Sequence, residues 1–224
     1  AVNAKDSKLT SLGISKAIKD KINIRVNGES KTKLSELARY LAVQVITPES
    51  FKLFWGGPKE RRRFIDLGLF HVEHDYGFQW QSFSKILKNR NALLRNAKVG
   101  VRVDNLDYWT ELFCKHSKIL NDYREKYIVK LVNELSSWLV LLLPTLTEEL
   151  EIHLFNGWNN KDIGLEEILQ KNSMQEQRYG YSIAGAHKFD LVCRYKGKLI
   201  DQVLSRGQQK LFLIALIFAQ ASII

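Results

Sequence analysis

Cysteine is scarce in this chain, which has only Cys114 and Cys193 among its 224 residues. Two cysteines so far apart form neither a disulfide framework nor a closely spaced metal-ligand pair, so a reducing compartment is expected. Long apolar runs are also lacking. The longest, residues 138–144 and 211–224, fall short of the roughly 20 residues that span a bilayer, and the amino-terminal stretch has no apolar signal core. We therefore interpret both runs as buried core and expect no membrane partner.

Acidic residues are too few to balance the basic ones. Asp and Glu number 24 against 34 Lys and Arg, which gives a formal net charge of +10. Such an excess favours a polyanionic partner, with nucleic acid ahead of an anionic membrane. A basic soluble protein without such a partner is the alternative. A hydrophobic fraction of 45% is enough to bury a core.

The first half of the chain predicts a hairpin followed by two long helices. INIRVNGES alternates like a strand and enters a tight turn at Asn27–Gly28. A short helix at 34–40 and a buried strand at 41–46 are expected next. Apolar spacing then predicts helices over 78–94 and 104–143, the second ended by Pro144. Two long helices joined by a short break favour an antiparallel helical arm.

The last third returns to a mixed pattern. A strand is predicted at 149–158, a helix at 164–180, and strand-like runs with a turn at 196–198. A nearly continuous apolar helix begins near residue 205. Because the chain stops inside this helix, where an exposed apolar surface would be a liability, we expect a fragment whose continuation is a core strand.

The stretch LSRGQQK, residues 204–210, resembles half of an ATP-binding site. Ser205 is able to cap the helix, Gly207 allows close approach of a ligand, and a helix amino terminus suits a phosphate. An ordinary capped core helix is the competing interpretation. The other half is missing, because the sequence contains no Gly-x4-Gly-Lys-Ser/Thr stretch and no apolar strand ending in paired acids. The chain alone is therefore not expected to build a complete ATP site.

A second motif, PESFKLFWGGPKERRRFID at residues 48–66, is more specific. It resembles the diagnostic pattern of the RecF family of bacterial DNA repair ATPases. YSIAGAHKFDL, followed by LSRGQQK, is similar to the later part of the same family. The resemblance covers essentially the whole chain. It would place the phosphate-binding loop upstream of Ala1 and an acidic, magnesium-binding strand downstream of Ile224.

The resemblance implies an α+β fold, with part of an ABC-type ATPase head built on a mixed sheet and an antiparallel helical arm. Residues 1–66 and 146–224 would belong to the head, and 67–145 to the arm. RecF proteins dimerise on ATP, bind single- and double-stranded DNA, and act with RecO and RecR to load RecA at single-strand gaps. The whole protein would be a weak DNA-dependent ATPase of the bacterial cytoplasm and nucleoid, and this chain would be inactive alone.

The resemblance also assigns nucleotide roles. Ser205, Arg206, Gly207 and Gln208 would meet the γ-phosphate of an ATP, with its magnesium, held by the other subunit. Gln44 lies near the place of a metal-sensing glutamine. The basic residues are expected to contact DNA phosphates. This set comprises Lys59, Arg61, Arg62, Arg63, Lys85, Lys88, Arg90 and Arg95, the last four in a stretch from Tyr76 to Val103 that has no acid.

Competing interpretations exist for several of these features. Lys85, Lys88 and Arg95 share a helical face that is able to serve as an ordinary solvated surface. Arg62 and Arg63 are candidates for ion pairs with Asp66. No metal site is expected, and no role follows for His187. A chromosome-maintenance-like ATPase, with an arm for protein contacts, is the rival function. A nuclease ranks last, for want of a carboxylate cluster.

Overall fold

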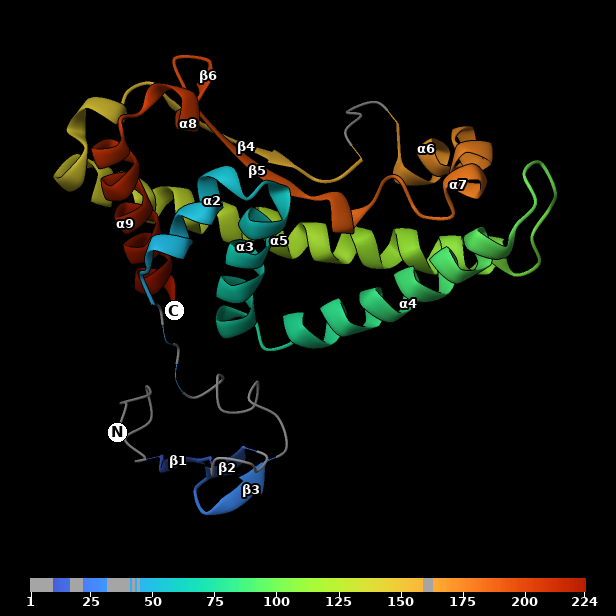
Figure 1. Ribbon diagram of the computed structural model, residues 1–224, viewed down its shortest axis with the longest axis horizontal. Helices are drawn as coiled ribbons and strands as arrows, with labels where there is room; N and C mark the ends of the chain where they lie inside the picture. Colours follow the sequence, from blue (N-terminus) through green and yellow to red (C-terminus); the bar gives the residue numbers. More distant parts are fainter. Residues whose placement is uncertain (1–9, 17–21, 32–40, 42, 44, 159–162) are drawn as a thin grey trace. The chain divides into compact units, whose positions relative to one another are not determined.

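The computed structural model describes residues 10–16, 22–31, 41, 43, 45–158 and 163–224 (Figure 1). Contacts divide the chain into two compact units, Ala1–Val45 with Ile224, and Ile46–Ile223. The described strands of the first unit form an antiparallel sheet in the order β1 (Leu12–Ser15), β2 (Asn23–Val26) and β3 (Glu29–Lys31). Asn27 and Gly28 both have positive φ, 50° and 84°, as a two-residue hairpin turn requires. The predicted hairpin is confirmed.

The described residues of 41–46 (41, 43, 45 and 46) differ from the prediction of a buried strand. Neither described sheet includes them, and Leu41, Val43 and Val45 are exposed. Their apolar pattern alone could not supply the neighbouring strands that bury both faces of a strand. The helix expected at 34–40 lies outside the described residues.

The second unit contains all of the described helices and a second sheet. Its strands are β4 (Leu150–Phe155), β5 (Asp190–Tyr195) and β6 (Lys198–Leu199). Its helices are α2 (Lys52–Trp55), α3 (Pro58–Val72), α4 (Tyr76–Asn96), α5 (Leu106–Leu142), α6 (Leu165–Lys171), α7 (Ser173–Tyr179), α8 (Ile200–Val203) and α9 (Arg206–Ile223), with 3-10 turns η1 (Pro48–Phe51), η2 (Pro144–Leu146) and η3 (Ala186–Lys188).

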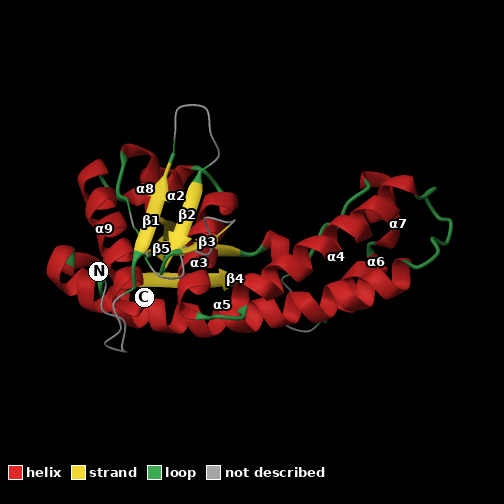
Figure 2. Ribbon diagram, turned by 90° about the horizontal axis from the view of Figure 1, so that it is seen from below, coloured by secondary structure: helices red, strands yellow, loops and turns green. Residues whose placement is uncertain are grey.

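Helices α4 and α5 form the predicted arm. They run side by side in opposite directions and extend away from α9, as both views show (Figures 1 and 2). Phe113, Leu120 and Leu131 are buried along one stripe of α5, the spacing of an amphipathic helix that faces a core. Its other half packs against α9, so a single helix of 37 residues connects the arm to the rest of the second unit.

The second sheet is antiparallel in the order β4–β5–β6, with Leu150 opposite Tyr195. The pairings of both described sheets are antiparallel, so the expected mixed sheet is not seen in this part of the chain. Lys196 and Gly197 form the predicted turn with positive φ. The helix expected at 164–180 is two short ones, which meet at Asn172. The Asn172 side chain donates to the Ile168 carbonyl at 2.8 Å, a local bond typical of residues at helix ends.

Helix α9 buries one face, with Phe212, Leu216 and Ala219 in the core. The interpretation of the apolar run 211–224 as core is confirmed for this face, whereas Leu211 and Phe218 are exposed. In the run 138–144, Leu139 and Leu143 are buried but Val140 and Leu141 are 60% and 73% exposed, so the expectation of a fully buried run is wrong there. Among the described residues, none of the helices combines the length and apolarity that crossing a membrane requires.

Candidate nucleotide and nucleic-acid sites

The amino terminus of α9 is closed by a reciprocal pair of hydrogen bonds. The backbone N–H of Gln208 donates to Ser205 Oγ at 3.3 Å, and the backbone N–H of Ser205 donates to Gln208 Oε1 at 2.9 Å. A serine followed three residues later by glutamine forms such a capping box. The predicted capping role of Ser205 is therefore confirmed, and Gln208 has a structural role that its place in the motif had not suggested.

The same terminus is open to solvent. Ser205, Arg206 and Gly207 are exposed, and a Cβ added at Gly207 would meet only Ser205 Oγ, at 4.0 Å. In the capping box the side-chain oxygens of Ser205 and Gln208 act as acceptors. The hydroxyl hydrogen of Ser205 and the side-chain NH₂ of Gln208 are donors that suit an anion such as a phosphate. The positive end of the helix dipole adds to this preference. The residues present thus fit the triphosphate of ATP.

Gln209 holds this terminus in place through side-chain hydrogen bonds, a role that the sequence did not predict. Its side chain is buried and donates to the carbonyls of Leu204 and Asp201, at 2.9 and 3.1 Å. These bonds fix α8 relative to the start of α9. Gln44 lies outside the described residues, and the described part of the chain has no cluster of three His, Cys, Asp or Glu side chains that could hold a metal ion.

The motif at 48–66 places two side chains against Phe189 and Asp190, at the start of β5. Gly57, with φ of 76°, and Pro58 begin α3. Arg61 donates to both carboxylate oxygens of Asp190, at 2.8 and 2.9 Å. Arg62 donates to the Phe189 carbonyl at 2.6 Å. Bonding to Asp190 raises the pKa of Arg61, whereas burial lowers the pKa of Arg62. Both guanidinium groups therefore have structural partners.

Asp66 binds a different arginine from the two that the sequence suggested. Its carboxylate accepts hydrogen bonds from Arg124 of α5 at 2.9 Å and from the Tyr76 hydroxyl at 2.5 Å. Arg124 is buried and also donates to the Ala186 carbonyl at 2.7 Å. Burial raises the pKa of Tyr76, so its hydroxyl stays protonated and serves as a donor. The proposed pairing of Asp66 with Arg62 or Arg63 is not found.

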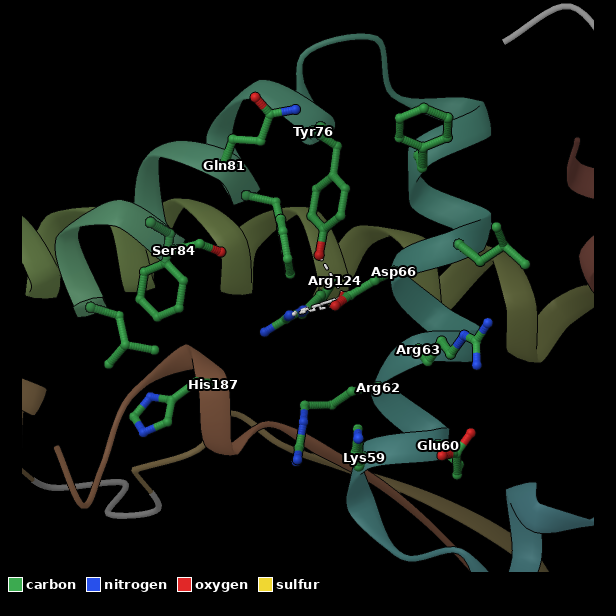
Figure 3. A pocket seen from close by; sticks show the side chains of 16 residues that line it. Lys59, Glu60, Arg62, Arg63, Asp66, Tyr76, Gln81, Ser84, Arg124 and His187 are labelled. Carbon is green, nitrogen blue, oxygen red and sulfur yellow. Dashed lines mark hydrogen bonds and ion pairs between the residues drawn. The ribbon is translucent and has the colours of Figure 1, made fainter. Parts of the chain in front are cut away.

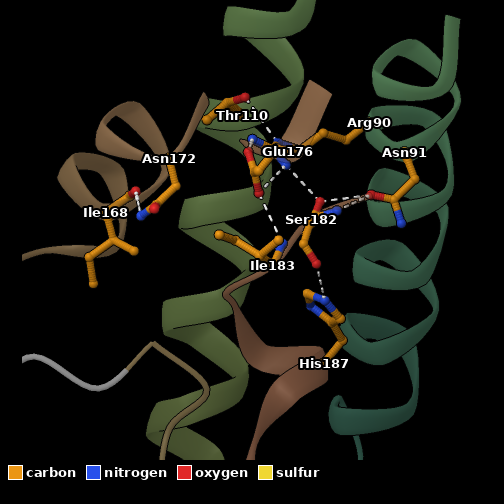
Figure 4. A network of polar contacts seen from close by, with 9 residues as sticks. All are labelled: Arg90, Asn91, Thr110, Ile168, Asn172, Glu176, Ser182, Ile183 and His187. Atoms are coloured by element: carbon orange, nitrogen blue, oxygen red, sulfur yellow. Dashed lines mark hydrogen bonds and ion pairs between the residues drawn. The ribbon is translucent and has the colours of Figure 1, made fainter. Parts of the chain in front are cut away.

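Arg90 lies in the interior rather than on the basic face of α4. It is 2% exposed and donates to both carboxylate oxygens of Glu176, which is 1% exposed (Figure 4). It also donates to Ser182 Oγ at 2.6 Å and to Thr110 Oγ1 at 3.0 Å. At 100° per residue, Arg90 faces almost opposite to Lys88 on the helix. Arg90 is therefore unavailable to a DNA phosphate, and the expectation is corrected.

His187 has the role that the sequence did not reveal. Its Nε2 lies 2.9 Å from the Ser182 carbonyl, to which a protonated nitrogen donates. The ring lies beside Phe83 and Phe113. Burial lowers its pKa to about 4, so the ring is neutral near pH 7. His187 thus folds the segment between residues 182 and 187 back on itself.

Four arginines from three helices therefore hold the segment 182–190. The set comprises Arg61 and Arg62 from α3, Arg90 from α4 and Arg124 from α5. This segment is the one whose sequence resembles the later part of the family pattern. Spacing rules missed Arg124, because they connect residues within one or two helical turns and not across 58 positions.

A cavity of about 650 Å³ opens between α3, α4, α5 and η3 (Figure 3). Arg62 and Lys59 lie on one side and His187 and Ser84 face them, while the Arg124–Asp66 pair reaches the centre. Aromatic side chains, Trp80 and Phe83 among them, complete the lining. Lys59 and Arg63 are exposed. The cavity thus joins a basic rim to an apolar wall.

The remaining predicted DNA contacts lie on the outer surface of α4. Lys85, Lys88 and Arg95 are exposed on this helix, and their positions share one face. The described structure thus divides the basic residues into two groups. Lys59, Arg63, Lys85, Lys88 and Arg95 are exposed, whereas Arg61, Arg62 and Arg90 bind protein groups.

Comparisons with known proteins agree with the resemblance. The chain is 47% identical, over all 224 residues, to the DNA replication and repair protein RecF of Colwellia psychrerythraea, and 41% identical over 213 residues to that of Pseudoalteromonas translucida. These matches cover 100% and 95% of this chain but 58% of each relative. No family model matches the chain.

Solved structures agree on the fold. A structure of the recombination mediator protein RecF with ATP, in the RecFOR pathway, superposes with a TM-score of 0.82 at 23% identity. The match covers 96% of this chain and 59% of the other. The α+β fold is thus that of RecF. With this fold and 47% identity over its whole length, the chain belongs to the RecF family and spans about 58% of the length of the relatives it matches.

Proposed function

We propose that this chain is part of a recombination mediator that binds DNA through phosphate contacts and acts with RecO and RecR to load RecA at single-strand gaps. Residues 1–66 and 146–224 contribute to an ATPase head, and 67–145 form its arm. The protein works in the bacterial cytoplasm, on the nucleoid. Support comes from the family membership and from the exposed cations of α4, a helix without acidic residues.

The amino terminus of α9 engages the γ-phosphate of an ATP that a second copy holds, with Mg²⁺ bound to the nucleotide. Ser205, Gly207 and Gln208 supply donors to that phosphate, and Arg206 adds a positive charge. Bound ATP supplies the energy of dimer closure. Support comes from the open, capped terminus. Because the sequence has no Gly-x4-Gly-Lys-Ser/Thr stretch, this chain should not bind ATP tightly by itself. Calorimetric titration showing tight 1:1 binding would contradict this assignment.

The exposed face of Lys85, Lys88 and Arg95 is the observation that carries the DNA-binding proposal. Each phosphate contact contributes roughly 0.9 to the slope of log affinity against log salt. Replacing all three by glutamine should weaken duplex binding and reduce that slope by up to about 2.7. Fluorescence anisotropy of a labelled duplex at several salt concentrations measures both.

A control with the same net charge uses three exposed lysines of α5. Lys115→Gln, Lys126→Gln and Lys130→Gln together also remove three positive charges. If this control weakens duplex binding as much as the α4 variant, binding depends on overall charge and not on the α4 face. If the α4 variant binds as the unaltered chain does, the arm is not part of the DNA surface.

The rival function is a chromosome-maintenance-like ATPase whose arm makes protein contacts. At 1.5 Å per residue, the 37 residues of α5 extend roughly 55 Å. That length suits a compact lobe better than a long tether, and it favours the recombination mediator.

A further inference from the structure

Two exposed tyrosines form an aromatic surface beside α4. Tyr179 and Tyr181 are 50% and 45% exposed, and their rings stack with centroids 5.7 Å apart and planes 17° apart. Gly180 between them has φ of 72°. A Cβ at this position would lie 2.9 Å from Arg95 Cγ, so the turn that brings the rings together needs glycine.

Positive charge lies next to this surface. Lys188 Nζ lies 5.5 Å from the centroid of the Tyr181 ring. Arg95 packs its side-chain stem over Gly180 and is exposed, as is Arg178, which precedes Tyr179 in the sequence. The acid of α7, Glu176, is buried and paired with Arg90. The exposed cations are therefore not neutralised by that carboxylate.

The segment that carries the tyrosines is fixed on the arm. Asn91 Oδ1 accepts hydrogen bonds from the backbone N–H and the hydroxyl of Ser182, both at 2.8 Å (Figure 4). The Ile183 N–H donates to Glu176 at 3.0 Å. Asn91 lies one turn from both Lys88 and Arg95 on α4. A ligand therefore meets a surface that is already ordered, next to the basic face of the arm.

We propose that the surface formed by Tyr179, Tyr181, Arg95, Arg178 and Lys188 binds the unpaired bases of single-stranded DNA. Exposed aromatic rings stack on bases of any sequence, and neighbouring cations hold the phosphates between them. In a duplex the bases already stack on each other, so these rings select single strands. The inference rests on the proposed DNA-binding function and deepens it, because α4 would contact duplex phosphates while the tyrosines contact the strand that leaves the duplex.

The test compares a labelled twelve-nucleotide thymidine strand with a labelled duplex in anisotropy titrations of the chain. The double variant Tyr179→Leu with Tyr181→Leu removes both stacking rings. It should weaken single-strand binding by at least about tenfold, because base–aromatic stacking supplies that much of the affinity. Duplex affinity should stay within about twofold. Tyr179→Phe with Tyr181→Phe should bind like the unaltered chain, because both rings remain. A strand carrying 2-aminopurine should show quenching with the aromatic variants and much less with the leucine variant.

Tyr108 of α5 provides a matched control, because it is also exposed, at 58%. Tyr108→Leu should leave single-strand binding unchanged. The inference is overturned if the double leucine variant binds the single strand normally, or if it loses duplex affinity equally. A failure of the unaltered chain to bind either DNA would overturn the proposed function as well. This inference alone is overturned if the triple glutamine variant of α4 loses duplex binding as expected while the double leucine variant still binds the single strand normally.

Discussion

The guanidinium of Arg90 donates two hydrogen bonds, of 3.2 and 2.6 Å, to the carboxylate of Glu176 in the interior between α4 and α7. The two residues are 86 positions apart and come from α4 and α7. Ser182 and Thr110 occupy further donors of Arg90. This arrangement neutralises a buried charge and joins α7 to α4, next to the exposed tyrosines.

Glu176→Gln should destabilise the protein strongly. The change leaves the Arg90 charge buried without its counter-charge, which costs about 3 kcal/mol or more in the free energy of unfolding. Urea denaturation followed by circular dichroism measures the loss. Glu166→Gln is the control, since Glu166 forms an exposed pair with Lys118 and should change stability by less than about 1 kcal/mol. Equal losses in the two variants would show that the buried pair is not important.

His187 should make the protein less stable in mild acid. Burial lowers its pKa in the folded state to about 4, whereas the unfolded value is near 6.5. The unfolded state therefore binds the proton first, and stability present above pH 6.5 is lost as pH falls toward 4. Between pH 7.5 and pH 5 this residue alone should account for about 2 kcal/mol.

Urea midpoints at the two pH values test this, with His187→Gln as the comparison. Glutamine does not titrate, and its amide is able to donate to the Ser182 carbonyl. The variant should therefore lose less stability on acidification than the unaltered protein. The same loss in both would assign the pH dependence to other groups.

Arg61→Lys should lower stability although the charge is kept. Lysine cannot reproduce the planar fork that donates to both oxygens of Asp190. One charged hydrogen bond is lost, at a cost of about 1–2 kcal/mol. Arg63→Lys is the control on the same helix, because Arg63 is exposed, and it should change stability by less than about 0.5 kcal/mol. Thermal unfolding distinguishes the two, and duplex affinity should be the same for Arg61→Lys and the unaltered chain.

Ser205→Ala should remove the cap of α9 and lower the free energy of unfolding by about 1 kcal/mol. Ser205→Asp keeps a capping oxygen, so its stability should stay within about 0.5 kcal/mol of the unaltered chain. Chemical denaturation of the three proteins decides the outcome. Unchanged stability in the alanine variant would mean that the hydrogen bond from Gln208 contributes nothing to folding.

Local features of the fold could be predicted because their causes are local. Asn27–Gly28 requires positive φ at both positions, and the hairpin follows. The apolar spacing on α5 and the break before it predicted the arm, and Ser205 with Gln208 has the spacing of a cap. The segment 41–46 shows the limit of such rules, because whether a strand forms depends on neighbouring strands that its own sequence does not contain.

The positions of the basic residues on α4 indicate which of them are buried. Lys88 and Arg90 are two residues apart, so a helix points them in nearly opposite directions. Phe83 and Leu94 are buried on this helix, as is Arg90. The lack of acids from Tyr76 to Val103 does not separate Lys88 from Arg90, whereas their positions on the helix do.

The sequence by itself determined the first hairpin, the two helices of the arm, the cap of α9 and the family, since each depends on residue types within a short stretch. Tertiary structure decided which arginines are structural. Asp66 meets Arg124 across 58 positions, and Asp190 meets Arg61 across 129. A charged side chain becomes a core residue only when folding brings an opposite charge to it and removes the water, and no spacing along the chain records that meeting.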